Sequence, residues 1–126
     1  MSSSVTDFSQ YYQAKSEPGF FIVTLSNATG KVNEMEVEAV VKSMRHAVDD
    51  PKVMGVIFDV THVEYFSSVG LSLLLRVHKA MKARKGRIAI ANPNANIREL
   101  LHVTSLDTIW PLFSSVDLAK SALAKH

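Results

Sequence analysis

The sequence predicts an α/β fold, with a mixed, mostly parallel β-sheet of four to five strands and about four helices. Two observations support this class. Residues 53–60 form a short apolar run rich in branched side chains, which is typical of a strand buried on both faces. Segments of helical periodicity lie before and after that run. Because strands alternate with helices along the chain, we expect βαβ units.

The N-terminal part of the chain is expected to contain two strands. Residues 8–14 are the first candidate and residues 20–25 the second, with a turn at Glu17-Pro18-Gly19 between them. Residues 26–30 are expected to form a loop. The seven residues before Phe8 are expected to be a loose terminus.

A helix is expected over residues 33–48. Asn33 has the residue type of an N-cap, and Glu36 follows three residues later as in a capping box. The apolar residues that follow recur at helical spacing, and Asp49-Asp50-Pro51 ends the helix. The rest of the chain is expected to form a connection at 61–67, a helix at 68–84 ended by Gly86, a strand at 87–91, a helix at 96–103, an edge strand at 108–110 and a final helix at 116–125.

Length and composition indicate one domain spanning residues 1–126. A net charge of +2 is far from the dense basic field of most nucleic-acid binders, so we expect no direct nucleic-acid partner. The absence of cysteine excludes disulfides and thiolate metal sites. No apolar run approaches the roughly 18 residues that a membrane span needs. We therefore expect a cytoplasmic protein without membrane insertion.

The sequence carries no recognisable catalytic motif, such as a Gly-rich phosphate loop, HExxH or G-x-S-x-G. Its histidines show no metal-ligand spacing. His78 lies beside apolar positions and is interpreted as a packing residue. Asp59 ends a strand and is interpreted as a loop-capping carboxylate. We therefore expect no enzyme, no catalytic residue, no metal and no cofactor.

The helix expected from Ser68 separates into two faces when its residues are placed 100° apart. The apolar sector, expected to face the sheet, holds Val69, Gly70, Leu73, Leu74, Val77, Ala80 and Met81. The opposite sector holds Ser68, Ser72, Arg76, Lys79 and Ala83, with Leu75 among them. This second sector is either an ordinary solvated face with one stray leucine or a recognition surface for a partner.

Ser67 and Ser68 stand at the start of that helix. A serine there can cap the helix by accepting a hydrogen bond from a free backbone N–H, worth about 1 kcal/mol. The same position favours a phosphate group, because free amides and the positive end of the helix dipole attract an anion. A phosphoserine would add about −1.5 to −2 charges to the surface without unfolding the helix.

Several segments together resemble the STAS domain of bacterial anti-sigma factor antagonists, most strongly over residues 20–122. The VIFDV strand precedes V-E-Y-F-S-S-V-G-L-S-L-L-L, which resembles the family's F-(x)-D-S-(S/T/A)-G-(L/I)-x-x-L-L segment. Gly30-Lys31-Val32-Asn33 resembles the stretch before the family's first helix, and Lys85-Gly86-Arg87 the entry to the next strand. Residues 96–113 resemble the family's helix, its "GLD" turn and last strand, with Ser105 where glycine is common.

The resemblance implies a STAS-like fold and a protein-binding module switched by phosphorylation. The phosphoacceptor falls on Ser68, with Ser67 in the place of the usual aspartate and as second choice, and Gly70 on the helix-start glycine. The implied partners are an anti-sigma factor that is a serine kinase of histidine-kinase-like fold, which the unphosphorylated form sequesters to free a sigma factor, and a serine phosphatase. The expected partner-binding residues are Ser67, Ser68, Ser72, Leu75, Arg76 and Lys79.

Two alternatives remain open from the sequence. In one, the same fold is a scaffold or a transporter-associated regulatory subunit, Ser67 and Ser68 are caps alone, and no phosphorylation switch operates. In the other, the chain is a small α/β enzyme or nucleotide binder that uses the strand ends near Asp59 and Asn92.

Overall fold

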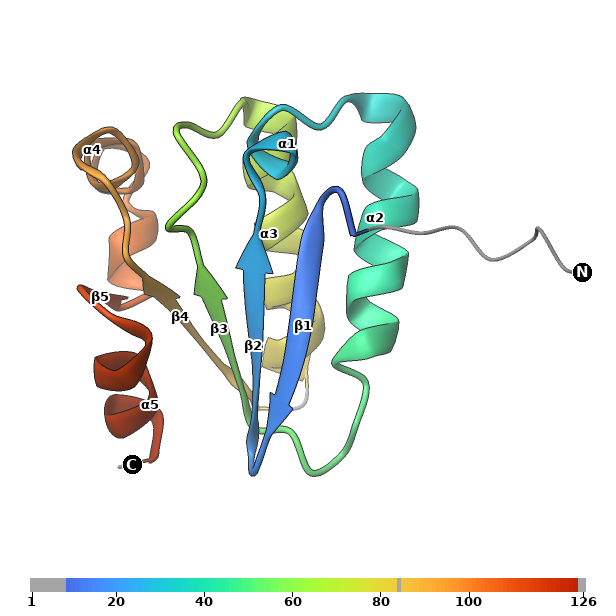
Figure 1. Ribbon diagram of the computed structural model, residues 1–126, viewed down its shortest axis with the longest axis vertical. Helices are drawn as coiled ribbons and strands as arrows, with labels where there is room; N and C mark the ends of the chain where they lie inside the picture. Colours follow the sequence, from blue (N-terminus) through green and yellow to red (C-terminus); the bar gives the residue numbers. More distant parts are fainter. Residues whose placement is uncertain (1–8, 84, 125–126) are drawn as a thin grey trace, which may run out of the picture.

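The computed structural model describes residues 9–83 and 85–124 (Figure 1). Its sheet is mixed and mostly parallel, as the sequence predicts. The described elements in chain order are β1 (Tyr12–Glu17), β2 (Phe20–Leu25), α1 (Asn27–Gly30), α2 (Glu34–Ala47), β3 (Gly55–Asp59), α3 (Ser68–Ala83), β4 (Arg87–Ala91), α4 (Ala95–Val103), the 3-10 helix η1 (Leu106–Thr108), β5 (Leu112–Phe113) and α5 (Val116–Ala124).

The five strands lie in the sheet in the order in which they occur in the chain, β1-β2-β3-β4-β5. The hairpin β1–β2 is antiparallel, and the pairs β2–β3, β3–β4 and β4–β5 are parallel. Helices α2 and α3 pack side by side on one face of the sheet, whereas α5 packs against β3 and β4 on the other (Figure 1). The carboxyl ends of the parallel strands therefore share one edge with the start of α3.

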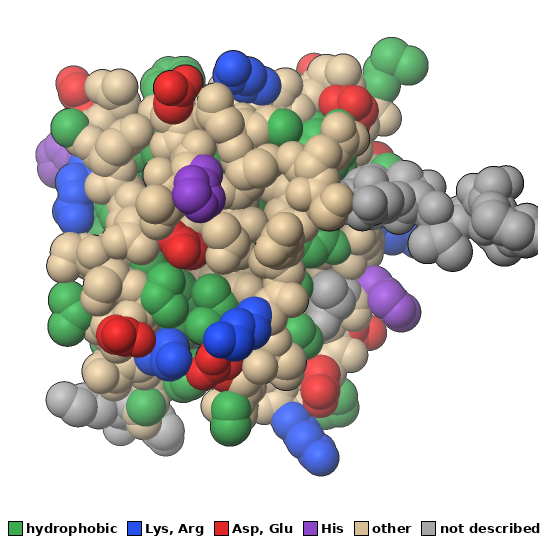
Figure 2. Space-filling model, in the orientation of Figure 1, with side chains coloured by type: hydrophobic (Ala, Val, Ile, Leu, Met, Phe, Trp, Pro, Cys, Tyr) green, Lys and Arg blue, Asp and Glu red, His purple; other side chains and the backbone are tan. Residues whose placement is uncertain are grey.

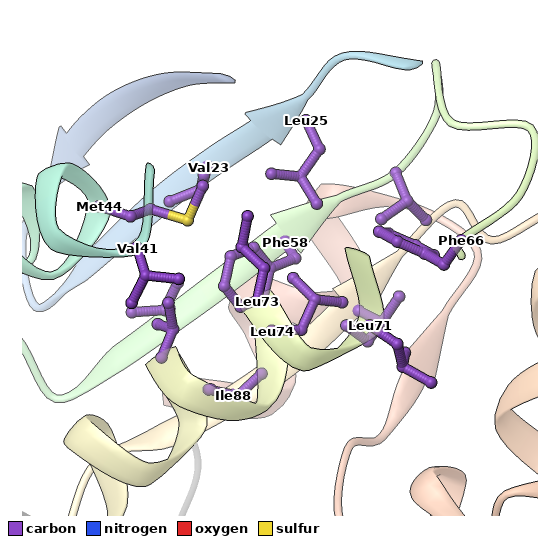
Figure 3. Packing of buried hydrophobic residues seen from close by; sticks show 14 of the residues in the cluster. Val23, Leu25, Val41, Met44, Phe58, Phe66, Leu71, Leu73, Leu74 and Ile88 are labelled. Carbon is purple, nitrogen blue, oxygen red and sulfur yellow. The ribbon is translucent and has the colours of Figure 1, made fainter. Parts of the chain in front are cut away.

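The core divides between the two faces because side chains alternate along each strand. On β3, Val56 and Phe58 belong to the larger cluster, which α2 and α3 complete, while Ile57 points to α5. On β4, Ala89 and Ala91 face α5, and these small side chains let that helix lie close to the sheet. Figure 3 shows the larger cluster, in which side chains of α3 interdigitate with those of β2, β3 and α2.

Three expected elements are wrong in position or type. The first strand is Tyr12–Glu17 rather than residues 8–14, and Phe8 lies outside the described residues. The reason is the two-residue hairpin turn: Glu17 pairs with Phe20, and Gly19 has φ 86, the left-handed value that the third position of a type II turn requires after proline. The strand must therefore run up to Glu17.

The loop expected at 26–30 contains the short helix α1. The edge strand expected at 108–110 is also absent from its place: residues 106–108 form η1, and the strand follows at Leu112–Phe113. Trp110 is instead turned fully into the core, where its indole finds a hydrogen-bond acceptor. A buried tryptophan needs such a partner, and that need overrides its β-propensity here.

The remaining elements agree with the expected positions to within a few residues. Asn33 caps α2, since its Oδ1 accepts a hydrogen bond from the Glu36 N–H at 2.9 Å. Asn94 caps α4 in the same way through the Ile97 N–H at 2.8 Å, so that helix begins at Ala95. The ends expected at Arg84 and Lys125 lie outside the described residues.

Charged side chains of both signs are scattered over the face seen in Figure 2 rather than gathered by sign. In the part of the chain that the structure describes, no helix combines the length and the apolarity that crossing a membrane demands.

Ser105 adopts φ 60, in the left-handed region, between α4 and η1. A side chain at this φ costs about 1–2 kcal/mol, whereas glycine adopts it freely. We therefore predict that Ser105→Gly raises the free energy of unfolding by roughly 0.5–1 kcal/mol.

The measurement is chemical denaturation, with Ser121→Gly as the matched control. Ser121 is exposed on α5, where the same change should lower stability by about 0.5 kcal/mol because glycine is the poorer helix former. A loss of stability in Ser105→Gly would contradict the prediction.

Candidate functional site

The start of α3 gives its two serines different surroundings. The half-buried Ser67 is held at both ends: its Oγ accepts a hydrogen bond from the Gly70 N–H at 3.1 Å, and its own N–H donates to the Gly30 carbonyl at 2.9 Å. Ser68, the first residue of α3, is exposed, and its hydroxyl has no hydrogen-bond partner among the described residues. Ser67 therefore serves as the cap, and Ser68 presents a free hydroxyl to solvent.

Two glycines allow α1 to approach the start of α3 at backbone contact distance. A Cβ on Gly70 would lie 2.9 Å from the Thr29 carbonyl oxygen and 3.0 Å from that of Gly30. A Cβ on Gly30 would lie 2.0 Å from the Tyr65 carbonyl oxygen. No side chain fits at either position without moving backbone, so the glycines fix where α3 begins.

The loop that leads into α3 is held by buried side chains and by hydrogen bonds with Asn27 of α1 and with Asn94 at the start of α4. Its Val63 and Phe66 side chains are buried. The Asn27 side chain accepts the Glu64 N–H at 2.9 Å, and the Asn94 side chain donates to the Glu64 carbonyl at 3.0 Å. These contacts hold the backbone that leads into Ser67 and leave Tyr65, with 55% of its surface exposed, on the outside.

A shallow groove of about 330 Å³ lies between α2 and α3 beside Ser68. Ser68, Ser72 and Arg76 line it from α3, and Glu34 and Glu38 line it from α2. The Arg76 Nη1 forms an ion pair with the Glu38 Oε1 at 2.9 Å. The groove therefore brings the exposed Ser68 hydroxyl together with two carboxylates and one guanidinium.

The outward sector of the helical wheel is exposed in the structure, with one exception. Ser72 is half-buried, and its hydroxyl donates to the Val69 carbonyl at 2.7 Å. Leu75 has 38% of its surface exposed, and Lys79 is exposed as well, but neither lines the groove. Leu71, which the wheel left unassigned, is buried with the apolar sector, while Val69 and Ala80 are half-buried.

Sequence reasoning missed the acidic side of this site. Glu34 and Glu38 are four residues apart, so they share one face of α2, and that spacing was readable from the sequence. Their approach to Ser68 depends on how α2 and α3 pair, which no local pattern reports. Tyr65 belongs to the serine-containing segment that the sequence singles out, but nothing in the sequence indicates that its side chain is exposed.

Asp59 and His78 have structural surroundings. The Asp59 Oδ1 accepts hydrogen bonds from the Thr61 N–H at 3.1 Å and the Asn92 side chain at 3.0 Å, as a loop-capping group does. The Trp110 indole N–H donates to the His78 Nδ1 at 3.0 Å, which requires that nitrogen to be unprotonated. Burial lowers the pKa of His78 below its usual value, and Lys82 lowers it further. Within the described residues, no cluster of three potential metal-ligating side chains occurs.

Comparison with known proteins places these features in a family. The model of the STAS domain matches residues 11–119, so the chain belongs to the STAS domain family. The protein BtrV of Bordetella bronchiseptica, named as an anti-sigma factor antagonist, is 25% identical over 104 residues, which cover 82% of this chain and 86% of BtrV.

Two solved structures are similar to this one. An anti-sigma factor antagonist (STAS) domain protein from Planctomyces limnophilus superimposes with a TM-score of 0.77 at 26% identity, over 90% of this chain and 98% of that one. The phosphorylated form of the Bacillus cell fate determinant SpoIIAA superimposes with a TM-score of 0.67 at 18% identity, over 88% and 97% of the two chains, and shares the fold.

Because of the close contact at Gly70, we predict that Gly70→Ala destabilises the protein, the opposite of what a glycine-to-alanine exchange usually does in a helix. Replacing glycine by alanine inside a helix ordinarily stabilises it by about 1 kcal/mol. At Gly70 the new methyl group would press on the carbonyls of Thr29 and Gly30, so Gly70→Ala should lower the free energy of unfolding by about 1–3 kcal/mol. Urea denaturation measures this, with Ser68→Ala in the same turn as control, expected within about 0.5 kcal/mol of wild type. A more stable Gly70→Ala would show that the contact does not constrain α3.

His78 yields a pH prediction. The pKa of His78 is lower in the folded chain than in the unfolded chain. As the pH falls to about 6.5, His78 therefore becomes protonated in the unfolded chain while it is still neutral in the folded chain. The His78 contribution is therefore fully present above about pH 6.5 and is lost as the pH falls below that value.

The measurement is stability against pH from 8 to 5 for wild type and His78→Asn, whose amide oxygen can still accept from Trp110. The wild-type curve should fall more steeply at the acidic end. His46→Asn, the same exchange at an exposed position, is the matched control. Equal slopes for His78→Asn and wild type would contradict the assignment.

Proposed function

We propose that this protein is an anti-sigma factor antagonist whose binding state is switched by phosphorylation of Ser68. The unphosphorylated protein binds an anti-sigma factor that is also a serine kinase of histidine-kinase-like fold, and this frees the sigma factor. Phosphorylation of Ser68 releases the kinase, and a serine phosphatase resets the switch. The names of the similar Bordetella and Planctomyces proteins support the class, and the geometry of Ser68 supports the switch.

The observation that carries the proposal is the free, exposed hydroxyl at the first residue of a helix whose other side is buried. Ser67, the second choice, already accepts one hydrogen bond with its Oγ and is half-buried. A kinase that used Ser67 would have to break the cap. Ser68 can be modified without any such loss.

A phosphate at Ser68 acts on the partner rather than on this fold. The free amides at the start of α3 tolerate an anion there. A partner that covers Ser68 and Leu75, in contrast, must desolvate whatever the serine carries, and burying a dianion costs far more than burying a hydroxyl. A penalty of about 3 kcal/mol already weakens binding more than a hundredfold.

The docking face includes the outward side of α3 and the loop before it. Leu75 supplies an apolar contact in a polar surface, and the exposed Tyr65 lies in the fastened loop before Ser67. Tyrosine often dominates binding energy in protein interfaces. Arg76 and Lys79 supply cations toward the other end of the face.

The test is phosphorylation in vitro. Incubation with ATP and a candidate serine kinase of histidine-kinase-like fold should add one phosphate to the wild type by intact mass and none to Ser68→Ala. Ser67→Ala and Ser72→Ala are matched controls that should still gain one phosphate, although Ser67→Ala should lose about 1 kcal/mol of stability with the cap. A phosphate that persists in Ser68→Ala and vanishes in Ser67→Ala would move the acceptor to Ser67.

The same kinase discriminates the switch from a constitutive scaffold. Pull-down by the kinase should retain wild type and lose Ser68→Asp, because the carboxylate places a charge in the interface. Retention of Ser68→Asp at wild-type levels would favour a scaffold that binds without phosphorylation control.

A further inference from the structure

The charged groups in the groove beside Ser68 are arranged so that a phosphate there would have one cation within the same groove. Glu34 and Glu38 line the groove from α2 and would repel a dianion, while Arg76 lines it from α3. Arg76 is occupied by Glu38, with 2.9 Å between Nη1 and Oε1. The question is which of the two anions Arg76 would hold once Ser68 is phosphorylated.

Helix geometry gives Arg76 access to Ser68. The residues at 68, 72 and 76 form one stripe along α3, and about 12 Å separates the first and last Cα atoms. Helical side chains lean toward the N-terminus, so the guanidinium extends from Arg76 toward Ser68. Ser72 between them is short, and its hydroxyl is turned to the Val69 carbonyl. Ser68 and Arg76 line the same groove, so the long Arg76 side chain extends toward the space that a phosphate on Ser68 would enter.

The existing ion pair holds Arg76 weakly. The side chains of Arg76 and Glu38 are 46% and 85% exposed, and such surface pairs contribute about 0–1 kcal/mol. A phosphate carries nearly twice the charge of a carboxylate and matches the planar guanidinium in a bidentate geometry. Exchange of the carboxylate for the phosphate is therefore favourable.

We propose that Arg76 is the positioning residue for the phosphate at Ser68 and that it leaves Glu38 to hold that phosphate. The proposal rests on the proposed modification of Ser68. Phosphorylation then changes the docking face in two ways, because the dianion appears at Ser68 and the Glu38 carboxylate loses its counter-charge. The cation that a partner meets on the unphosphorylated face is withdrawn toward the helix start.

The test uses the full chain with phosphoserine inserted at position 68 during translation, and it follows the second ionisation of the phosphate by ³¹P NMR. A nearby cation favours the dianion and lowers this pKa. Arg76→Gln should therefore raise the phosphate pKa by about 0.5, and Glu38→Gln should lower it. Lys79→Gln, which removes an exposed cation from the same helix outside the groove, is the matched control and should leave it unchanged.

The double variant Glu38→Gln/Arg76→Gln distinguishes competition between Glu38 and the phosphate for Arg76 from direct repulsion between Glu38 and the phosphate. If Glu38 competes for Arg76, most of the effect of Glu38→Gln should vanish in the Arg76→Gln background. Additive effects, or equal shifts in Arg76→Gln and Lys79→Gln, would overturn the proposal. Arg76→Lys should restore part of the wild-type value, since lysine keeps the charge and loses the bidentate fit.

These outcomes are independent of the proposed function. Because translation installs the phosphoserine, the ³¹P measurement needs no kinase. A chain that no kinase modifies would sink the proposed switch and leave the Arg76 result standing. A phosphate pKa that is the same in wild type and Arg76→Gln would contradict the proposal for Arg76 and would leave Ser68 as the proposed acceptor.

Discussion

The site depends on the contact between the backbone of α1 and the first turn of α3. A Cβ at Gly70 would press on the carbonyl oxygens of Thr29 and Gly30 in α1, and a Cβ at Gly30 would press on the Tyr65 carbonyl oxygen in the loop before α3. The contact places the Gly30 carbonyl where it accepts the Ser67 N–H. Ser67 is thereby committed to capping, and the next residue, Ser68, is turned to solvent.

The sheet supports that arrangement from beneath. Leu73, Leu74 and Val77 anchor α3 in the larger core cluster, and Phe66 anchors the loop that leads into it. The outer side of α3 makes no contribution of this kind to the core. A charge added at Ser68 therefore alters what the surface attracts, while the packing that positions the helix is untouched. The outer surface of α3 can therefore change without affecting the core, as a surface that binds another protein requires.

Local patterns in the sequence predicted the elements with strong periodicity or composition, such as α2, α3, β3 and β4. They failed where a distant contact decides the structure: the register with β2 places β1, and the burial of Trp110 against His78 displaces the last strand. The position of Ser68 followed from motif resemblance and the helical wheel. Its acidic neighbours on α2 could not be predicted in this way, because their approach to Ser68 depends on how α2 and α3 pair on one face of the sheet.

Ser105 illustrates how resemblance and physics complement each other. The resemblance indicated a position where glycine is common, and the structure supplies the reason, since the residue has φ 60. Serine occupies a conformation there that disfavours any side chain. The difference concerns the turn between α4 and η1.

The two borders of the sheet bear on how copies of the chain meet one another. The final strand, β5, offers two residues, too few for another chain to align with. The opposite border, β1, carries Lys15 and Glu17, whose side chains form an ion pair, and charged residues on such a border discourage strand addition. Association through continuous sheets is thus disfavoured at both borders.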